Sequence, residues 1–305
     1  MARLIPLALA LAAAAGLSPL LGAPAPKSAL DCPAPPGWSD VLKQAPRFVV
    51  FGELHGTEQP PQLIGQLVCA EALKGKRVLL AVELDSRFDD RLQAAWKLPS
   101  GQFEPALAKL DWEGRQDGLA SKAMFDLLVR MHLLKERGLP VAITAFNGAK
   151  SKEQFEKFSN LPGQGGHEAT QAENIANAAT AGAPDLVIVL VGNFHARKAP
   201  IARRGVAWDP MARYLSGYGK VVSLDIRYGP GTSWNCLMKP DVKLAPGQRV
   251  GPEHINCGPS PTPGNTKGTG PVRIALPATD PAASAEGFDG TFWVGPVTAS
   301  PPAFP

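Results

Sequence analysis

FGELHGTEQ, at residues 51–59, follows an apolar run and places Glu53, His55 and Glu58 within six residues. A strand is expected before it at Arg47–Phe51, where Phe48 to Phe51 are continuously apolar, which is typical of a strand buried on both faces of a parallel sheet. In open α/β sheets, ligands bind outside the carboxyl ends of the strands. We therefore expect Glu53 and His55 to form part of a site, with the rest supplied by other strand ends.

Further short apolar runs alternate with helical segments along the chain. Strands are expected at Arg77–Val82, Pro140–Phe146, Asp185–Val191 and Lys220–Leu224. Helices are expected at Pro61–Leu73, Asp89–Trp96, Ser121–Arg137, Glu168–Thr180 and Met211–Leu215. This alternation predicts an α/β fold with a mostly parallel β-sheet flanked by helices. The Pro/Gly-rich region Ser260–Ser284 is expected to be irregular, and Thr291–Val294 to return as an edge strand.

Polar side chains follow the predicted strands at the same end. A lone acid after a strand is often only a helix cap or a loop residue, and this is an equally good interpretation of Asp85 and Asp225. Two histidines and two glutamates at three strand ends are harder to assign to chance, so we predict one shared site. Its members are Glu53, His55, Glu83 and His195. Residues expected to support these side chains from the surrounding structure are Asp85, Asp117, Asn174 and Asn193.

Such a set of residues supports two hydrolytic routes. In the first, a histidine takes a proton from water and a glutamate orients it, while the other histidine or backbone N–H groups polarise the carbonyl. Imidazole suits this role at its ordinary pKa. In the second, His55, His195 and one or both of Glu53 and Glu83 hold a divalent metal with an open position. The sequence does not choose between them.

Other common kinds of site are missing from the sequence. There is no G-x-S-x-G elbow, since Leu215-Ser216-Gly217 lacks the first glycine at the needed place. There is neither a P-loop nor a G-x-G-x-x-G after a strand. A formal net charge of +4 without a dense Lys/Arg patch gives no reason to expect nucleic acid as a partner. The expected partner is a small-molecule substrate.

The first 25 residues have the composition of a secretory signal, with Arg3 at a basic start and an almost wholly apolar Leu4–Leu21. Gly16 and Pro19 interrupt the run, which argues against a membrane span. We expect a periplasmic or secreted protein with no stable membrane span once the signal is removed.

The four cysteines fit two disulfide bridges, which export makes plausible. Cys236 and Cys257 are nearest in sequence and flank a Pro/Gly-rich loop, so they are the favoured pair. Cys32 and Cys69 then remain for the second bridge.

Four short motifs, in the order in which they occur along the chain, resemble those of a known superfamily. They are GELHGT at Gly52–Thr57, VELD at Val82–Asp85, QAENI at Gln171–Ile175 and VGNFHA at Val191–Ala196. The pattern is similar to the superfamily that joins erythromycin-esterase-like hydrolases, ChaN-type haem-binding lipoproteins and Tiki/TraB proteins, over about residues 45 to 230.

The resemblance implies an α/β fold with roles for Glu53, His55, Glu83 and His195 at the strand ends. In esterase-like members the histidine of the first motif is thought to activate water. In Tiki proteins the G-x-x-H spacing, here Gly52 to His55, is associated with a metal-dependent peptidase. ChaN-type members bind haem instead.

The chain departs from the esterase-like pattern in one place. Relatives are expected to carry an Arg-acid pair and then Met-Ala, where this chain has His167-Glu168 and Gln171-Ala172. Loss of the arginine would remove a fixed donor for an anionic or carbonyl group. We interpret His167 as an exposed residue beside a glycine loop.

These observations predict an exported hydrolase that cleaves an ester, lactone or amide bond. The alternative is a ChaN-like protein that binds haem or a metal without catalysis. The expected organisation is a signal peptide at 1–25, an EreA/ChaN-like α/β domain at 32–258 and a Pro/Gly-rich C-terminal extension at 259–305.

Overall fold

The computed structural model describes residues 30–110, 112–245 and 247–304. Its centre is a seven-stranded sheet in the order β10-β11-β7-β1-β4-β2-β3, parallel except for the β10–β11 pair. This confirms the predicted mostly parallel α/β fold. The strands are β1 Phe48–Glu53, β2 Val78–Asp85, β3 Val141–Asn147, β4 Leu186–Gly192, β7 Val221–Gly229, β10 Arg273–Ala275 and β11 Gly290–Pro296.

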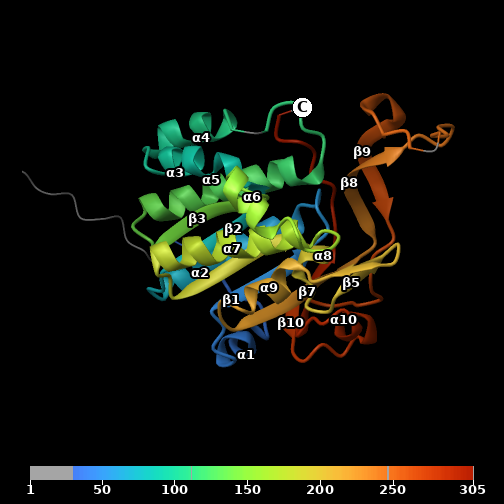
Figure 1. Cartoon of the computed structure of the whole chain (residues 1–305). Coiled ribbons are helices and arrows are strands. Elements are labelled where there is room, and N and C mark those ends of the chain that lie inside the picture. The colour runs from blue at the N-terminus through green and yellow to red at the C-terminus, as the bar shows by residue number, and fades with distance from the viewer. Residues whose placement is uncertain (1–29, 111, 246, 305) are drawn as a thin grey trace, which may run out of the picture.

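Helices cover both faces of this sheet (Figure 1). Val49 and Phe51 of β1 pack into one apolar cluster, and Phe48 and Val50 pack into another, as the alternation of side chains in a strand requires. The first face carries α2 Gln59–Leu73, α3 Asp89–Trp96, α4 Ser100–Ala108 and α5 Lys122–Glu136. The second carries α7 Gly165–Gly182, α8 Asn193–Ala196 and α9 Met211–Leu215.

The remaining elements lie around this core. Figure 1 shows the hairpin of β8 and β9 extending away from the sheet. The helices are α1 Trp38–Lys43, α6 Lys152–Phe158 and α10 Pro281–Ala285, with 3-10 turns η2 Ser86–Phe88, η3 Gly118–Ala120 and η4 Pro252–His254. The two hairpins are β5 Ile201–Arg203 with β6 Val206–Trp208, and β8 Gly231–Met238 with β9 Ile255–Thr262.

The strand expected at the edge of the sheet lies inside it. β11 includes Thr291–Val294, but β10 pairs antiparallel along its outer side, so β11 has strand neighbours on both sides. The edge position was therefore a wrong prediction. A three-residue strand inside a Pro/Gly-rich stretch gives too short a pattern to be recognised from sequence.

Two disulfides tie the chain, with the pairing that the sequence favoured. Cys236 and Cys257 face each other across β8 and β9, and Cys32 joins Cys69 of α2. Disulfides persist in oxidising compartments, so both bridges are consistent with export. The predicted signal peptide lies outside the described residues. Across the described ranges, none of the helices has the length and apolar character needed to cross a bilayer.

The loop after β1 is held from two sides. Gly56 accepts hydrogen bonds at its carbonyl from the backbone N–H groups of Trp234, on β8, and Ser300, in the C-terminal segment, at 2.8 and 2.9 Å. Gly56 has a φ of +75°, and a Cβ there would lie 2.3 Å from the Trp234 carbonyl oxygen. A side chain at this position would thus clash with β8 as well as strain the backbone. The C-terminal segment therefore helps to position the strand end that carries His55.

Candidate active site

Acids and imidazoles alternate in a chain of contacts at the carboxyl ends of β1, β2 and β4. The His55 Nδ1 lies 3.0 Å from Glu53 Oε1, and its Nε2 lies 3.3 Å from Glu83 Oε2. The other oxygen of Glu83 lies 3.4 Å from His195 Nε2. The Nδ1 of His195 lies 2.8 Å from both carboxylate oxygens of Glu168. The Glu83 carboxylate thus lies between the two imidazoles. The other ring nitrogen of each imidazole contacts a second glutamate, which is Glu53 for His55 and Glu168 for His195.

The sheet order explains why residues far apart in sequence meet here. β4 lies between β1 and β2, and Glu53 pairs in register with Gly192 at the end of β4. Gly192 is followed at once by the single turn of α8, which carries His195. The structure therefore brings together the four residues that the sequence singled out, and their catalytic role stays a prediction.

Gly192 leaves the space that the His55 ring occupies. Its N–H donates to Glu83 Oε2 at 2.7 Å, and a Cβ on it would lie 2.7 Å from His55 Nε2. Real Cβ atoms do not approach a ring nitrogen that closely, so one of the two groups would have to move.

Replacing Gly192 with Ala is expected to displace the His55 ring while leaving the fold intact. The backbone of Gly192 has a φ of −57° and a ψ of 144°, which alanine adopts without strain. Misplacing a reacting group by about 1 Å can cost about 10²-fold in rate. We expect kcat to fall by roughly 10- to 100-fold in steady-state assays, with a far-UV circular dichroism spectrum that shows the fold is kept. An unchanged kcat would contradict the close approach described here.

The acids of this cluster are more deeply buried than its imidazoles. Glu53, Glu83 and Glu168 are 4%, 4% and 2% exposed, whereas the side chains of His55 and His195 are 28% and 21% exposed. The imidazoles therefore form the accessible surface of the site. A small molecule entering from solvent would meet them first.

In this cluster, burial and the neighbouring charges shift the pKa of each side chain in opposite directions. Burial raises the pKa of Glu53. For Glu83, burial also opposes ionisation, but the charge of His55 and hydrogen bonds to the carboxylate outweigh it and lower the pKa to about 2. Burial alone would lower the pKa of His55, yet the charge of Glu83 and hydrogen bonds to both acids raise it to about 10.

The second imidazole follows the same pattern. Burial acts to lower the pKa of His195, but the hydrogen bond with Glu168 and the charge of Glu83 raise it overall. His55 is thus held in the protonated form at neutral pH, and the pKa of His195 is shifted in the same direction. The expectation that a histidine here works at its ordinary pKa was wrong, because the flanking carboxylates favour the imidazolium.

Glu168 and His167, on the first turn of α7, were not placed in the site by the sequence. Glu168 holds His195 and also accepts a hydrogen bond from the Met211 N–H at 2.8 Å. The ring of His167 lies 5.9 Å from that of His195, and the residue is half-buried rather than exposed as predicted. Burial lowers its pKa. One sequence signal could have located them. They stand where the family that the chain resembles is expected to carry its Arg-acid pair.

The residues expected behind the site have other immediate partners. Asp85 pairs with Arg87 at 2.5 Å and caps η2, just after β2 changes register against β3 between Val82 and Asp85. A supporting role for Asp85 stays a prediction. Asp117 caps η3 and pairs with Arg115 at 2.9 Å.

The two asparagines lie at element ends. Asn174 donates from Nδ2 to the carbonyls of Phe146 and Gly148 at 3.0 and 2.8 Å, which fixes the end of β3 against α7. Asn193 is the first residue of α8 and packs against Gly52 of β1, where a Cβ would lie 3.0 Å from the Asn193 Cα. Both residues thus hold backbone segments near the cluster.

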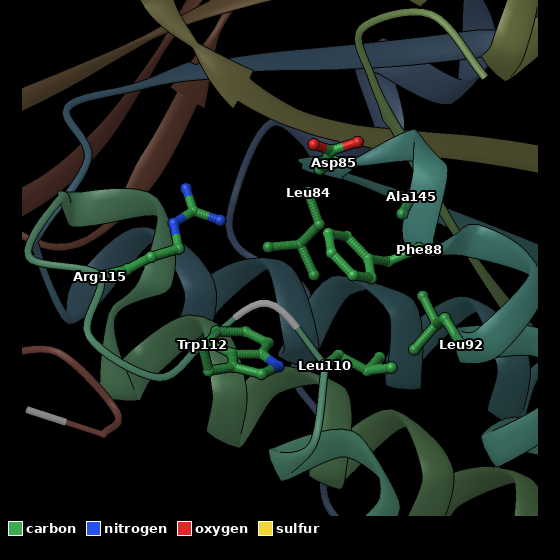
Figure 2. Close-up of a pocket in the computed structure, with 8 residues that line it drawn as sticks. All are labelled: Leu84, Asp85, Phe88, Leu92, Leu110, Trp112, Arg115 and Ala145. Atoms are coloured by element: carbon green, nitrogen blue, oxygen red, sulfur yellow. The ribbon is translucent and has the colours of Figure 1, made fainter. Parts of the chain in front are cut away.

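A small cavity lies beside Asp85 (Figure 2). Figure 2 shows Leu84 and Phe88 among its apolar walls, with Asp85 and Arg115 at its polar end. Its volume is about 10 Å³, which is close to the least that admits one water molecule. This cavity is therefore too small to receive a substrate.

The candidate metal ligands of the cluster are paired with one another. In each histidine of the cluster one ring nitrogen contacts one glutamate and the other contacts Glu83. Within the part of the chain that the structure describes, no group of three or more His, Cys, Asp or Glu side chains is arranged to hold a metal ion. The metal-assisted route stays a prediction, and no step below uses it.

Comparison with solved structures supports the fold that the motifs predicted. An erythromycin esterase mutant, EreC in its open conformation, matches with a TM-score of 0.59 and 12% identity over 86% of this chain and 94% of that one. A succinoglycan biosynthesis protein matches with a TM-score of 0.56 and 12% identity over 86% and 91%. ChaN of Campylobacter jejuni, with haem bound, matches at 0.37 and 13% over 63% and 86%, too weakly to carry an argument. No protein-family model and no curated protein sequence matches the chain.

Proposed function

We propose that this chain is a hydrolase that cleaves an ester, lactone or amide bond in a small molecule. The observation that carries the proposal is the position of Glu83 between His55 and His195, each backed by a buried glutamate. Nucleophile activation by a histidine that a carboxylate orients is a common hydrolytic arrangement. Both imidazoles are partly open to solvent, so a substrate could reach them.

The geometry supports a division of labour between the two histidines. Neutral His55 takes a proton at Nε2 from water, and the hydroxide forms a bond to the carbonyl carbon. The imidazolium of His195 donates from Nε2 to the oxyanion, which is where preorganised charge contributes most. When the tetrahedral intermediate collapses, the bond to the leaving group breaks and His55 returns its proton to that group. Glu53 and Glu168 hold the two Nδ1–H groups throughout.

The location and organisation of the chain belong to the same proposal. A secretory composition at residues 1–25 and two disulfides support export to the periplasm or beyond. We retain 32–258 as the α/β domain and 259–305 as its C-terminal extension. The extension contributes β10 and β11 to the sheet, so it is expected to be required for folding.

The direct test is hydrolysis by the purified, disulfide-bonded chain. We expect turnover of p-nitrophenyl esters or of simple lactones, and its response to a chelator separates the metal-free route from the metal-assisted one. Haemin is titrated in parallel and followed by its Soret band. A Soret shift that depends on His55 or His195, together with no turnover of any ester, lactone or amide, would replace this proposal with the haem-binding one.

The pH dependence of the rate should follow the ionisation of His55. The resting imidazolium must lose a proton before it can act as a base, and its pKa is raised from 6.5 to about 10. We therefore expect kcat/KM to rise about tenfold per pH unit from pH 6 to 9, measured with a substrate whose uncatalysed hydrolysis is subtracted. A plateau that begins near pH 6.5 would mean that the carboxylates do not control this histidine.

A further inference from the structure

A second, larger pocket lies between α6 and the first turn of α7. Its volume is about 270 Å³, and Phe155, Phe158, Leu161 and His167 are among the residues that line it. An apolar cavity of about 150 Å³ is enough to bind benzene, so this pocket has room for a ring or an acyl chain of about six carbons. It is the right size for one part of a substrate rather than for a whole drug-sized ligand.

The lining of this pocket carries no formal charge and combines Phe155, Phe158 and Leu161 with the uncharged polar residues Ser159, Gln164 and Thr170. Phe155 is 64% exposed, and Phe158 is half-buried beside it. Lys157 lies over the Phe158 ring at 5.0 Å, but its charge is paired with Glu173. No aspartate, glutamate, lysine or arginine is among the lining residues in the described part of the chain. An uncharged apolar group is the occupant that such walls favour.

His167 connects this pocket with the histidine cluster. It lines the pocket, and its ring lies 5.9 Å from the ring of His195. Its Nε2 lies 2.9 Å from Nε2 of Gln171, which is fully buried and also donates to Asn147 Oδ1 at 2.9 Å. The contact with Gln171 therefore fixes the orientation of the His167 ring. Through His167, the pocket adjoins the histidine cluster.

The turn that closes the pocket is packed firmly. Gly163 has a φ of +57°, and a Cβ on it would lie 2.4 Å from the ring of Trp208. The backbone thus rests directly on the indole, which anchors the segment between α6 and α7 to the β5–β6 hairpin. A pocket whose walls are held in this way is largely formed before a ligand binds.

We propose that this pocket seats the apolar acyl group of a neutral ester, so that the ester carbonyl is held beside His195. The inference rests on the proposed function and names its substrate class, uncharged esters with a medium-length or cyclic acyl group. The observations that carry it are the shared His167, the apolar side chains of Phe155, Phe158 and Leu161 in a lining without formal charge, and a volume suited to about six carbons.

The test compares p-nitrophenyl hexanoate with p-nitrophenyl acetate. Burial of each methylene is worth about fourfold, so the ratio of kcat/KM between the two esters should be roughly 10² in the wild type. Phe158→Ala should lower that ratio about tenfold, mainly through KM. Leu133→Ala, which removes an exposed side chain from the surface of α5, is the matched control and should keep the wild-type ratio.

A binding experiment separates failure of the pocket from failure of the hydrolase. Binding of 2-heptanone, an uncharged ketone that is not hydrolysed, is measured by ligand-observed NMR on the wild type and Phe158→Ala. Turnover with a flat chain-length profile, or a ratio unaffected by Phe158→Ala, overturns the pocket alone. Saturable ketone binding that Phe158→Ala weakens, without any turnover, overturns the hydrolase alone. Neither turnover nor binding overturns both.

Discussion

Replacing His55 with Ala is expected to lower kcat/KM by about 10²- to 10⁴-fold, the range that general-base catalysis contributes. His55 is the one imidazole that contacts both Glu53 and Glu83, and its side chain is 28% exposed. Its removal takes away the group that activates water, whereas His195 and Glu168 remain in place. The loss should therefore lie in kcat more than in KM, measured with the best ester found.

Two further variants test whether the lost activity comes only from disturbing the buried carboxylates or from removing any histidine. His55→Ala leaves two buried carboxylates without their shared partner, so His55→Gln is included to keep a polar group between them. His254→Ala removes a histidine from the β8–β9 hairpin, where its Nδ1 accepts a hydrogen bond from the Gly251 N–H. We expect wild-type rates from His254→Ala. Retained activity in folded His55→Ala would eliminate the proposed mechanism.

The sheet and the core of the site were predictable because they follow from local chemistry. A short apolar run that ends in Glu53 and His55 implies a buried strand with a site at its carboxyl end. The same reasoning found Glu83 and His195, and parallel pairing then places all four side chains at one edge. The strand ends can be recognised locally, whereas the neighbours of each strand depend on the order of the strands in the sheet.

Glu168 and His167 were not predictable in this way, because they come from a helix. Their approach to His195 depends on how α7 packs across the sheet, and a helix start in a glycine-rich stretch gives no indication of that. Asp85 follows a register change of β2 against β3 and pairs with Arg87, which spacing alone does not indicate. Such irregularities are set by neighbouring strands and not by the local sequence.

The raised pKa of His55 could not have been read from the sequence either. An isolated imidazole ionises near pH 6.5, and only the convergence of Glu53 and Glu83 shifts it to about 10. The strand ends were recognised as polar, but the charge balance at their meeting point depends on distances between strands. The chemistry of the site is therefore a tertiary property, although its residues are visible in the sequence.

Glu83→Gln is expected to destabilise the fold by about 3–5 kcal/mol near pH 6, the usual cost of removing one partner of a buried ion pair. The pKa of Glu83 is lowered from 4.5 to about 2, so its stabilising effect is present above pH 4.5 and is lost as the pH falls towards 2. The pKa of His55 is raised from 6.5 to about 10, so its effect is present below pH 6.5 and is lost as the pH rises to 10. The difference between wild type and variant should thus be largest between pH 4.5 and 6.5.

Urea unfolding at pH 5.5 and pH 9 measures this difference. Glu71→Gln is the matched control, because Glu71 is also buried but is paired with Lys74, Lys76 and Trp38 and not with a histidine. We expect the penalty of Glu83→Gln to shrink between pH 5.5 and 9 and that of Glu71→Gln to stay constant. The activity of Glu83→Gln should reach its plateau at a lower pH than the wild type, because His55 loses a negative neighbour. Equal penalties at both pH values would show that Glu83 does not hold the imidazoles in their charged form, and the ionic account of the site would have to be abandoned.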